Sequence, residues 1–186
     1  MAARYRIDPR RSRFTVQAFA TGALGFLGHS PTFAVRDYAG ALRFEGGQIA
    51  GLALELTVRA DSLDLQDRVG ASDRREIEDR MRRDVLETDR DPEITYRAAN
   101  PAVEELARGR YRLRIDGDLS LHGDTRRQPV DAELIVFGDG VQLVGGASLR
   151  MPDYGIRPVT ALGGTIRLKD EVRVAFDLAA PLEEQP

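Results

Sequence analysis

The chain contains no cysteine and only two histidines, His29 and His122, among its 186 residues. Without cysteine it can form no disulfide, no thiolate zinc site and no iron–sulfur cluster, and it lacks a thiol nucleophile. Two imidazoles are too few for a transition-metal site built by the protein alone. We therefore expect no metal site and no required cofactor.

The sequence also lacks an excess of charge of one sign. It has 27 Lys and Arg residues and 30 Asp and Glu residues, which gives a formal net charge of −3. Because the two signs are interleaved along the chain, no positive face suited to a phosphate backbone is indicated. We expect no nucleic-acid partner.

Long apolar runs are missing as well. No stretch approaches the eighteen or so apolar residues of a membrane helix, and the first residues, MAARYRIDPRRSRF, lack the apolar segment of a signal peptide. We expect a soluble, cytoplasmic protein with no integral membrane span. A signal peptide removed earlier would instead place it in the periplasm.

Catalytic motifs are scarce. The pattern G-x-S-x-G is absent around His29 and Ser30, and neither a P-loop nor a G-x-G-x-x-G turn occurs. We interpret His29 as a loop residue and His122 as a residue that makes a hydrogen bond in a turn. We predict no catalytic residues. The segment Thr21–Pro31 is rich in glycine and is compatible with a loop, a short helical turn or a flap.

The sequence does contain a repeated alternation of apolar and polar residues. It is clearest from Tyr111 to Leu121, where every second residue is apolar except Gly117. Side chains of a strand alternate between two faces, so this pattern predicts a half-buried antiparallel strand. About nine such strands are indicated: Phe14–Ala20, Leu42–Phe44, Leu52–Val58, Ile94–Ala98, Tyr111–Leu121, Val130–Val136, Leu143–Leu149, Ile166–Leu168 and Val172–Leu178.

Short links join many of these strands, such as His122–Gln128, Gly138–Gly140 and Lys169–Asp170. An all-β, meandering antiparallel sheet follows, which buries its apolar faces either as two stacked sheets or as one closed barrel. An eight-stranded barrel is the size that holds one small ligand. Strands of about nine residues would give such a barrel a tunnel of roughly 23 Å.

One segment has the period of a helix. From about Asp73 to Leu86 there is no Gly or Pro, and Ile77, Met81 and Val85 recur every four residues. This spacing predicts an inserted amphipathic helix over 73–86. Asp73 and Glu76 have the spacing of a capping box, and Glu76 with Arg80 and Glu78 with Arg82 are spaced for ion pairs.

Six segments, taken in order, resemble the YceI-like family. The strongest similarity is the turn GDLSLHGDTR, which resembles the family pattern G-x-L-T-I-H-G-x-T-K. The six segments are Tyr5–Val16, Tyr38–Leu42, Ala60–Asp64, Arg83–Tyr96, Gly117–Arg126 and Arg150–Ile156. The chain departs from the family at Val85–Asp89, where relatives usually have aromatic residues.

The resemblance implies a single antiparallel lipocalin-like barrel of about eight strands, over residues 4–179, with the helix beside its opening. It implies a flexible tail over 180–186 and allows for a homodimer. The implied function is non-enzymatic binding, storage or transport of a long-chain hydrophobic molecule: a polyisoprenoid, an isoprenoid quinone precursor or a fatty-acid derivative. Two alternatives stay open, a packed barrel acting as a protein-interaction or stress-response module, and an enzyme using His29 or His122.

For the ligand-binding wall we predict apolar residues of the strands and of the helix. They are Phe14, Val16, Phe44, Leu54, Leu56, Ile77, Met81, Tyr96, Leu113, Ile115, Leu149, Val174 and Phe176. An anionic headgroup at the mouth is predicted to meet Arg82 or Arg150, although Arg150 is equally placed to pair with Asp153.

Overall fold

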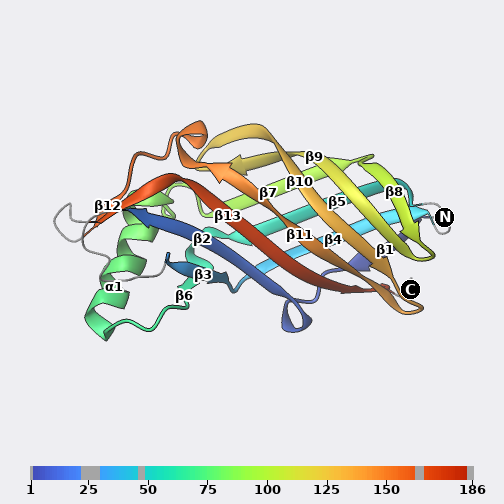
Figure 1. Cartoon of the computed structure of the whole chain (residues 1–186), viewed down its shortest axis with the longest axis horizontal. Coiled ribbons are helices and arrows are strands. Elements are labelled where there is room, and N and C mark those ends of the chain that lie inside the picture. Colours follow the sequence, from blue (N-terminus) through green and yellow to red (C-terminus); the bar gives the residue numbers. More distant parts are fainter. Residues whose placement is uncertain (1, 22–29, 46–48, 162–165, 184–186) are drawn as a thin grey trace.

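The computed structural model describes residues 2–21, 30–45, 49–161 and 166–183. These residues form one curled, mostly antiparallel sheet of thirteen strands and one α-helix. Figure 1 shows an elongated barrel with α1 at one end and with β1 and β8 at the other. His29 and most of the glycine-rich segment Thr21–Pro31 lie outside the described residues.

The sheet order is β1-β4-β5-β7-β9-β10-β11-β13-β2-β3-β6, with β8 on β9 and β12 on β13. The strands are β1 Ala2–Arg6, β2 Arg13–Thr21, β3 Thr32–Val35, β4 Tyr38–Glu45, β5 Ala50–Arg59, β6 Leu63–Leu65, β7 Glu93–Ala99, β8 Ala102–Ala107, β9 Arg110–Leu121, β10 Asp124–Val136, β11 Gly140–Arg150, β12 Thr160–Ala161 and β13 Ile166–Pro181.

Apart from the two-residue strand β12, the strands reduce to eight ribbons, because four ribbons are each interrupted once. β1 and β2 are separated by the 3-10 turn Pro9–Arg11, and β5 and β6 by the turn Ala60–Ser62. β3 continues into β4 after two residues, and β7 continues into β8 on the same edge of β9. The prediction of a barrel of about eight strands is therefore confirmed, although the number of separate strands is larger.

The barrel closes where β13 meets the ribbon of β1 and β2. β13 pairs with β2 through its middle, while Leu182 forms a bridge with Tyr5 of β1. The amide of Glu183 donates to the carbonyl of Arg4 at 2.8 Å. Ala180 and Pro181 pair with β11, while Leu182 and Glu183 bond to β1, so the tail that was predicted to be flexible from Ala180 is paired at these four residues.

Two predicted links differ from the structure. The link His122–Gln128 is a two-residue hairpin, because β10 already begins at Asp124. His122 and Gly123 have φ values of 54° and 79°, as a type I′ turn requires. Lys169–Asp170 is no turn at all: it lies within β13, where the register with β2 shifts between Leu168 and Val172. A bulge bends the strand there without reversing it.

The helix differs from the prediction at both ends. α1 spans Ala71–Arg80 and continues as a π-helix over Met81–Val85, with the Leu86 amide donating to the Met81 carbonyl at 2.9 Å. Gly70 is the N-cap and no side chain caps the helix, so the predicted capping box at Asp73 is wrong. The Glu76–Arg80 and Glu78–Arg82 ion pairs are confirmed, at 3.4 and 3.6 Å.

The core lies inside the barrel and is densest away from α1. Leu42, Leu113, Ile115 and Leu134 are fully buried there, and the rings of Tyr5 and Phe44 stack with centroids 4.8 Å apart. Among the described residues, no polar or charged residue is buried. We call this region the packed half. The half that is covered by α1 is different, and it contains the candidate site.

Candidate functional site

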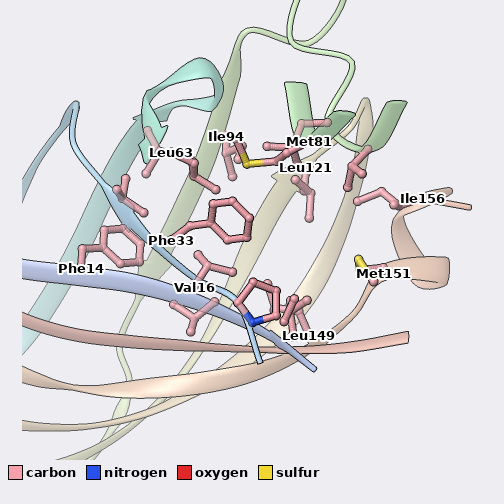
Figure 2. Close-up of a pocket in the computed structure, with 18 of the residues that line it drawn as sticks. Phe14, Val16, Phe33, Leu63, Met81, Ile94, Leu121, Leu149, Met151 and Ile156 are labelled. Atoms are coloured by element: carbon pink, nitrogen blue, oxygen red, sulfur yellow. The ribbon is translucent and has the colours of Figure 1, made fainter. Parts of the chain in front are cut away.

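The half of the barrel next to α1 encloses a cavity of about 280 Å³ (Figure 2). Its wall is made by residues of β2, β3, β5, β6, β7, β9, β10, β11 and β13, by α1 and the π-helix, and by Met151 and Ile156 after β11. A cavity of about 150 Å³ lined by aliphatic and aromatic side chains stays dry and takes up benzene. A larger apolar cavity of this kind is suited to an apolar ligand.

The cavity exists because small residues occupy inward positions near the mouth. Along β2 the inward positions are Phe14, Val16, Ala18 and Ala20, so the side chains shrink toward α1. Ala147 takes an inward position on β11 in the same way. Methyl groups at these positions reach less far into the barrel than the leucines of the packed half, and the space between opposite walls stays unfilled.

Aromatic rings line the part of the cavity that lies away from α1. Phe14 and Phe176 are register neighbours on β2 and β13, and their rings meet edge to face with centroids 6.4 Å apart. The ring of Phe14 also meets that of Tyr38 edge to face, at 5.4 Å. On β13 the lining continues past Phe176 to Leu178, and on β11 it includes Leu143, so the rings narrow the cavity without ending it.

Tyr96 packs its ring closely against Gly117. A Cβ atom at Gly117 would lie 2.6 Å from the Tyr96 hydroxyl oxygen, so only glycine leaves room for this ring. The Tyr96 hydroxyl donates to the carbonyl of Gln128 at 2.9 Å. Burial raises the pKa of Tyr96 to about 12. The phenol is therefore neutral at physiological pH, and with the Gln128 side chain it is the only polar group that the described strands present to the cavity.

Charged residues occur only where α1 faces the cavity. Within the described part of the wall these are Asp73, Glu76 and Arg80. Arg80 pairs with Glu76 and donates to the carbonyl of Thr160 at 2.9 Å. The wall is thus apolar inside and mixed in charge at the mouth, an arrangement that suits an apolar tail with a polar end.

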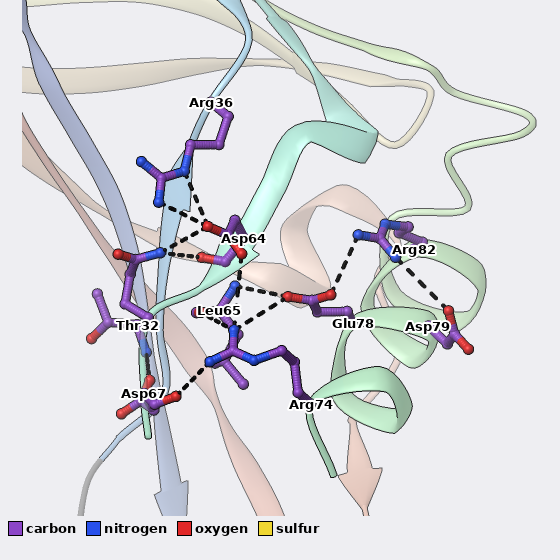
Figure 3. A network of polar contacts seen from close by, with 10 residues as sticks. Thr32, Arg36, Asp64, Leu65, Asp67, Arg74, Glu78, Asp79 and Arg82 are labelled. Carbon is purple, nitrogen blue, oxygen red and sulfur yellow. Dashed lines mark hydrogen bonds and ion pairs between the residues drawn. The ribbon is translucent and has the colours of Figure 1, made fainter. Parts of the chain in front are cut away.

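Side chains of α1 hold the helix to the edge strand β6 (Figure 3). Glu78 accepts a hydrogen bond from the amide of Leu65 at 3.2 Å, and Arg74 donates to the carbonyls of Leu65 and Asp67. Asp64 extends the network, since it accepts from Arg36 at 2.8 Å. That hydrogen bond lowers the pKa of Asp64. The helix is therefore attached to the sheet by polar groups outside the cavity.

The π-helix and His122 lie around the same end of the barrel. Met81 and Val85 of the π-helix contribute to the cavity wall. The His122 ring does not line the cavity: its Nδ1 lies 3.1 Å from the carbonyl oxygen of Tyr154, and its Nε2 lies 3.5 Å from Glu87. His122 thus joins the β9–β10 hairpin to the segment that follows the helix.

The structure brings most of the predicted wall residues together. Ten of them line the cavity: Phe14, Val16, Leu54, Leu56, Ile77, Met81, Tyr96, Leu149, Val174 and Phe176. The other three, Phe44, Leu113 and Ile115, lie in the packed half and do not reach the cavity. They face inward as predicted, but at a different level along the barrel axis.

Neither predicted headgroup residue lines the cavity. Arg82 points to Glu78 and Asp79, at 3.6 and 3.8 Å, and Arg150 pairs with Asp153 at 3.8 Å. Arg80, two residues before Arg82, is the arginine that lines the cavity among the described residues. Sequence reasoning missed Leu119, Leu121 and Val130 as wall residues, although their alternation pointed to the same face.

A metal site and a membrane-spanning helix are both absent from the part of the chain that the structure describes. The described residues contain no group of three or more His, Asp or Glu side chains placed to hold a metal ion. Within the same ranges, no helix is both long enough and apolar enough to cross a bilayer.

The comparisons with known proteins identify the family. The family model of the YceI-like domain matches residues 5–180, so the chain belongs to the YceI-like family. No curated protein matches it in sequence.

Several solved structures resemble this chain, among them the following three. Burkholderia cenocepacia BcnA is 16% identical, with a TM-score of 0.69, over 94% of this chain and 99% of that one. A polyisoprenoid binding domain from Saccharophagus degradans is 15% identical, with a TM-score of 0.68, over 96% and 98%. The YceI protein of Campylobacter jejuni is 14% identical, with a TM-score of 0.60, over 81% and 84%. At these identities the likeness shows the fold.

Proposed function

We propose that this YceI-like protein is a non-enzymatic binder of an apolar-tailed small molecule, which it stores or carries in the barrel. The observation that carries the proposal is the cavity of about 280 Å³, whose wall is apolar and whose charged lining residues all belong to α1. The tail lies against the strands, and the polar end lies beside α1. An isoprenoid or a fatty-acyl derivative has this shape.

Transfer free energies support binding without any polar anchor. Burying one methylene group contributes about 0.8 kcal/mol, so a tail of ten carbons contributes about 8 kcal/mol. That figure corresponds to a dissociation constant of about 1 μM before the costs of association are subtracted. A carrier that must also release its ligand needs affinity of this order or weaker.

The chemistry of the wall favours binding over catalysis. Tyr96 is held neutral and donates to the backbone carbonyl of Gln128, and the Gln128 side chain accepts from the Tyr154 hydroxyl at 3.5 Å, so both groups are engaged in hydrogen bonds within the protein. One similar structure is that of a polyisoprenoid binding domain, which supports a ligand of this class. We therefore assign no catalytic residue.

The test is ligand uptake by a variant with a filled cavity. Ala147 faces the cavity and Ala175, on the neighbouring strand, faces outward, so Ala147→Phe and Ala175→Phe add the same ring on opposite faces of the wall. The probe is dodecan-1-ol, delivered from cyclodextrin and measured by displacement of a fluorescent naphthylamine. Native mass spectrometry records any ligand that purifies with the protein.

We expect the wild type and Ala175→Phe to bind dodecan-1-ol equally, and Ala147→Phe to bind it at least tenfold more weakly. Circular dichroism and urea unfolding check that both variants are folded. Equal binding by all three proteins would place the ligand outside the cavity. Absence of binding to the wild type, by this probe and by farnesol, would refute the proposal.

A further inference from the structure

We propose that the cavity selects molecules whose only polar group stands at one end of a hydrocarbon tail, and that Tyr96 and Gln128 set this selectivity. Both residues line the cavity, but their hydrogen-bonding groups are already paired within the protein. This inference rests on the proposed function and narrows its ligand. A second hydroxyl or keto group along the tail would enter the cavity without a partner.

The barrel strands place very few polar side chains in the cavity wall. Among the described lining residues that belong to strands, Tyr96 and Gln128 alone have a polar side chain. The charged lining residues Asp73, Glu76 and Arg80 all belong to α1. A polar group of a ligand that lies among the strands therefore has only two side chains with which it could form a hydrogen bond.

The Tyr96 hydroxyl is engaged within the wall. Its proton is donated to the backbone carbonyl of Gln128 at 2.9 Å. The ring reaches this carbonyl over Gly117, where a Cβ atom would lie 2.4 Å from Cζ of the tyrosine. A phenol has one proton to donate, so a ligand could receive it only if the existing hydrogen bond were broken.

The Gln128 side chain is engaged as well. Its Nε2 donates to the carbonyls of Pro129 and Ser148, at 2.9 and 3.2 Å, which uses both amide protons. Its Oε1 accepts from the Tyr154 hydroxyl at 3.5 Å. Throughout the described ranges, no buried side-chain nitrogen or oxygen atom lacks a hydrogen-bond partner. The cavity wall thus offers a ligand no free donor among its strand residues.

Gln128 cannot turn toward a ligand without opening the wall. In the direction of α1, the last register pair of β10 and β11 is Asp131 with Gly146. Pro129 has no N–H group with which to extend the ladder. Beyond this point, the hydrogen bond from the Gln128 side chain to Ser148 of β11 joins the two strands. The amide is therefore part of the wall and is not available as a ligand-binding group.

An unpaired polar group weakens binding, because it gives up its hydrogen bonds with water and receives none in return. For one buried hydroxyl, this loss corresponds to a dissociation constant that is about tenfold to a hundredfold larger. A hydrocarbon tail carries no such penalty. The cavity consequently accepts a plain alkyl or isoprenoid tail and rejects the same tail with a second polar group.

The experiment compares isomers that differ only in the position of the second hydroxyl. Dodecane-1,2-diol keeps both hydroxyls at one end, whereas dodecane-1,6-diol and dodecane-1,12-diol place the second hydroxyl along the tail and at its far end. Dissociation constants are measured by displacement of the naphthylamine probe, and dodecan-1-ol is the positive control. We expect the wild type to bind the 1,6- and 1,12-diols at least about tenfold more weakly than the 1,2-diol.

Two variants give the wall free hydrogen-bonding capacity and should relax this selectivity. Tyr96→Phe frees the backbone carbonyl of Gln128, and Val130→Thr adds a hydroxyl of nearly the same shape at another lining residue. In each variant, the preference for the 1,2-diol over the 1,6- or the 1,12-diol should fall by about threefold or more.

Matched controls make the same changes away from the cavity. Tyr38→Phe removes a hydroxyl from a buried tyrosine, and Val144→Thr adds one on a valine that is 38% exposed; neither residue lines the cavity. Both controls should keep the selectivity of the wild type. Circular dichroism verifies that all four variants are folded, and the two lining variants test the inference independently of each other.

Equal binding of the three diols by the wild type would overturn the inference while leaving the proposed function intact, since dodecan-1-ol would still bind. A preference that is unchanged in both Tyr96→Phe and Val130→Thr would also overturn it, because the selectivity would then not depend on the pairing of polar groups in the wall. Failure of the wild type to bind dodecan-1-ol would instead remove the proposed function.

Discussion

The two halves of the barrel are built from the same strands but differ in how they fill their interior. On β9, Leu113 and Ile115 are fully buried in the packed half, while Leu119 and Leu121 of the same strand line the cavity. The packed half has leucine, isoleucine and stacked aromatics at its inward positions. The half next to α1, which contains the cavity and which we call the hollow half, has alanine at several of its inward positions. Side-chain size along one strand therefore separates a region that supplies stability from a region that supplies space.

The difference between the halves explains how the barrel can remain folded although part of its interior is a cavity. Close packing in the interior maximises dispersion contacts, and a void forfeits those of its lining. The packed half retains these contacts, while α1 lies over the end of the barrel that contains the cavity. The hollow half is the part of the barrel that gains contacts when a ligand enters.

The largest expected effect is on the free energy of unfolding, when the same substitution, leucine to alanine, is made in each half of the barrel in a separate variant. Leu113→Ala should destabilise the protein by about 3–5 kcal/mol, because the cavity it creates is surrounded by rigid packing. Leu149→Ala enlarges a cavity that already exists and should cost about 1–2 kcal/mol, mainly through lost apolar burial. Urea unfolding measures both. Equal losses would show that the two halves do not differ in packing.

The next largest effect concerns Gly117, which leaves room for the Tyr96 ring at the cavity wall. Gly117→Ala puts a methyl group 2.8 Å from the carbonyl of Arg97 and closer still to the tyrosine ring, so we expect a loss of about 1–3 kcal/mol. Gly138→Ala is the control, since nothing lies within 4 Å of its new Cβ. Thermal unfolding should leave Gly138→Ala near the wild type. A stable Gly117→Ala protein would mean that Tyr96 moves freely.

The smallest effect is a dependence on alkaline pH. Burial raises the pKa of Tyr96 from 10.0 to about 12, so the unfolded chain ionises first and the folded state loses stability as pH rises from about 10 to about 12. Below pH 10 this contribution is fully present. Tyr96→Phe should make stability decline less steeply over that window. Burial also raises the pKa of Tyr38 and Tyr154, so a reduced slope is expected to remain. An unchanged slope in Tyr96→Phe would show that this phenol is solvated.

Alternation in the sequence predicted which face of each long strand turns inward. It could not predict how far along the barrel axis a residue lies. Leu113 and Leu119 of β9 are both part of the same apolar–polar alternation, but only Leu119 lines the cavity. It also missed β8, whose residues are all exposed and therefore show no alternation. β3 and β6 were missed because four and three residues are too few to display a period.

The helix shows which part of a site escapes sequence reasoning. Its apolar stripe correctly placed Ile77 and Met81 toward the barrel. Its charged residues were harder to assign, because the sequence does not tell which of Arg80 and Arg82 lies beside the cavity. Arg82 pairs with Glu78 and Asp79 at the ordinary helical spacings of four and three residues, while Arg80 lines the cavity. The π-helix over Met81–Val85 also has no signature in the sequence.

The attachment of α1 to β6 has a consequence for solubility. Glu78 and Arg74 occupy the amide and the carbonyl of Leu65, groups that a neighbouring strand would otherwise claim. An uncovered strand edge is a template for pairing with another chain. Any movement that lifts α1 from β6 therefore also exposes unpaired backbone groups at a strand edge, so the same two side chains both cover the cavity and satisfy that edge.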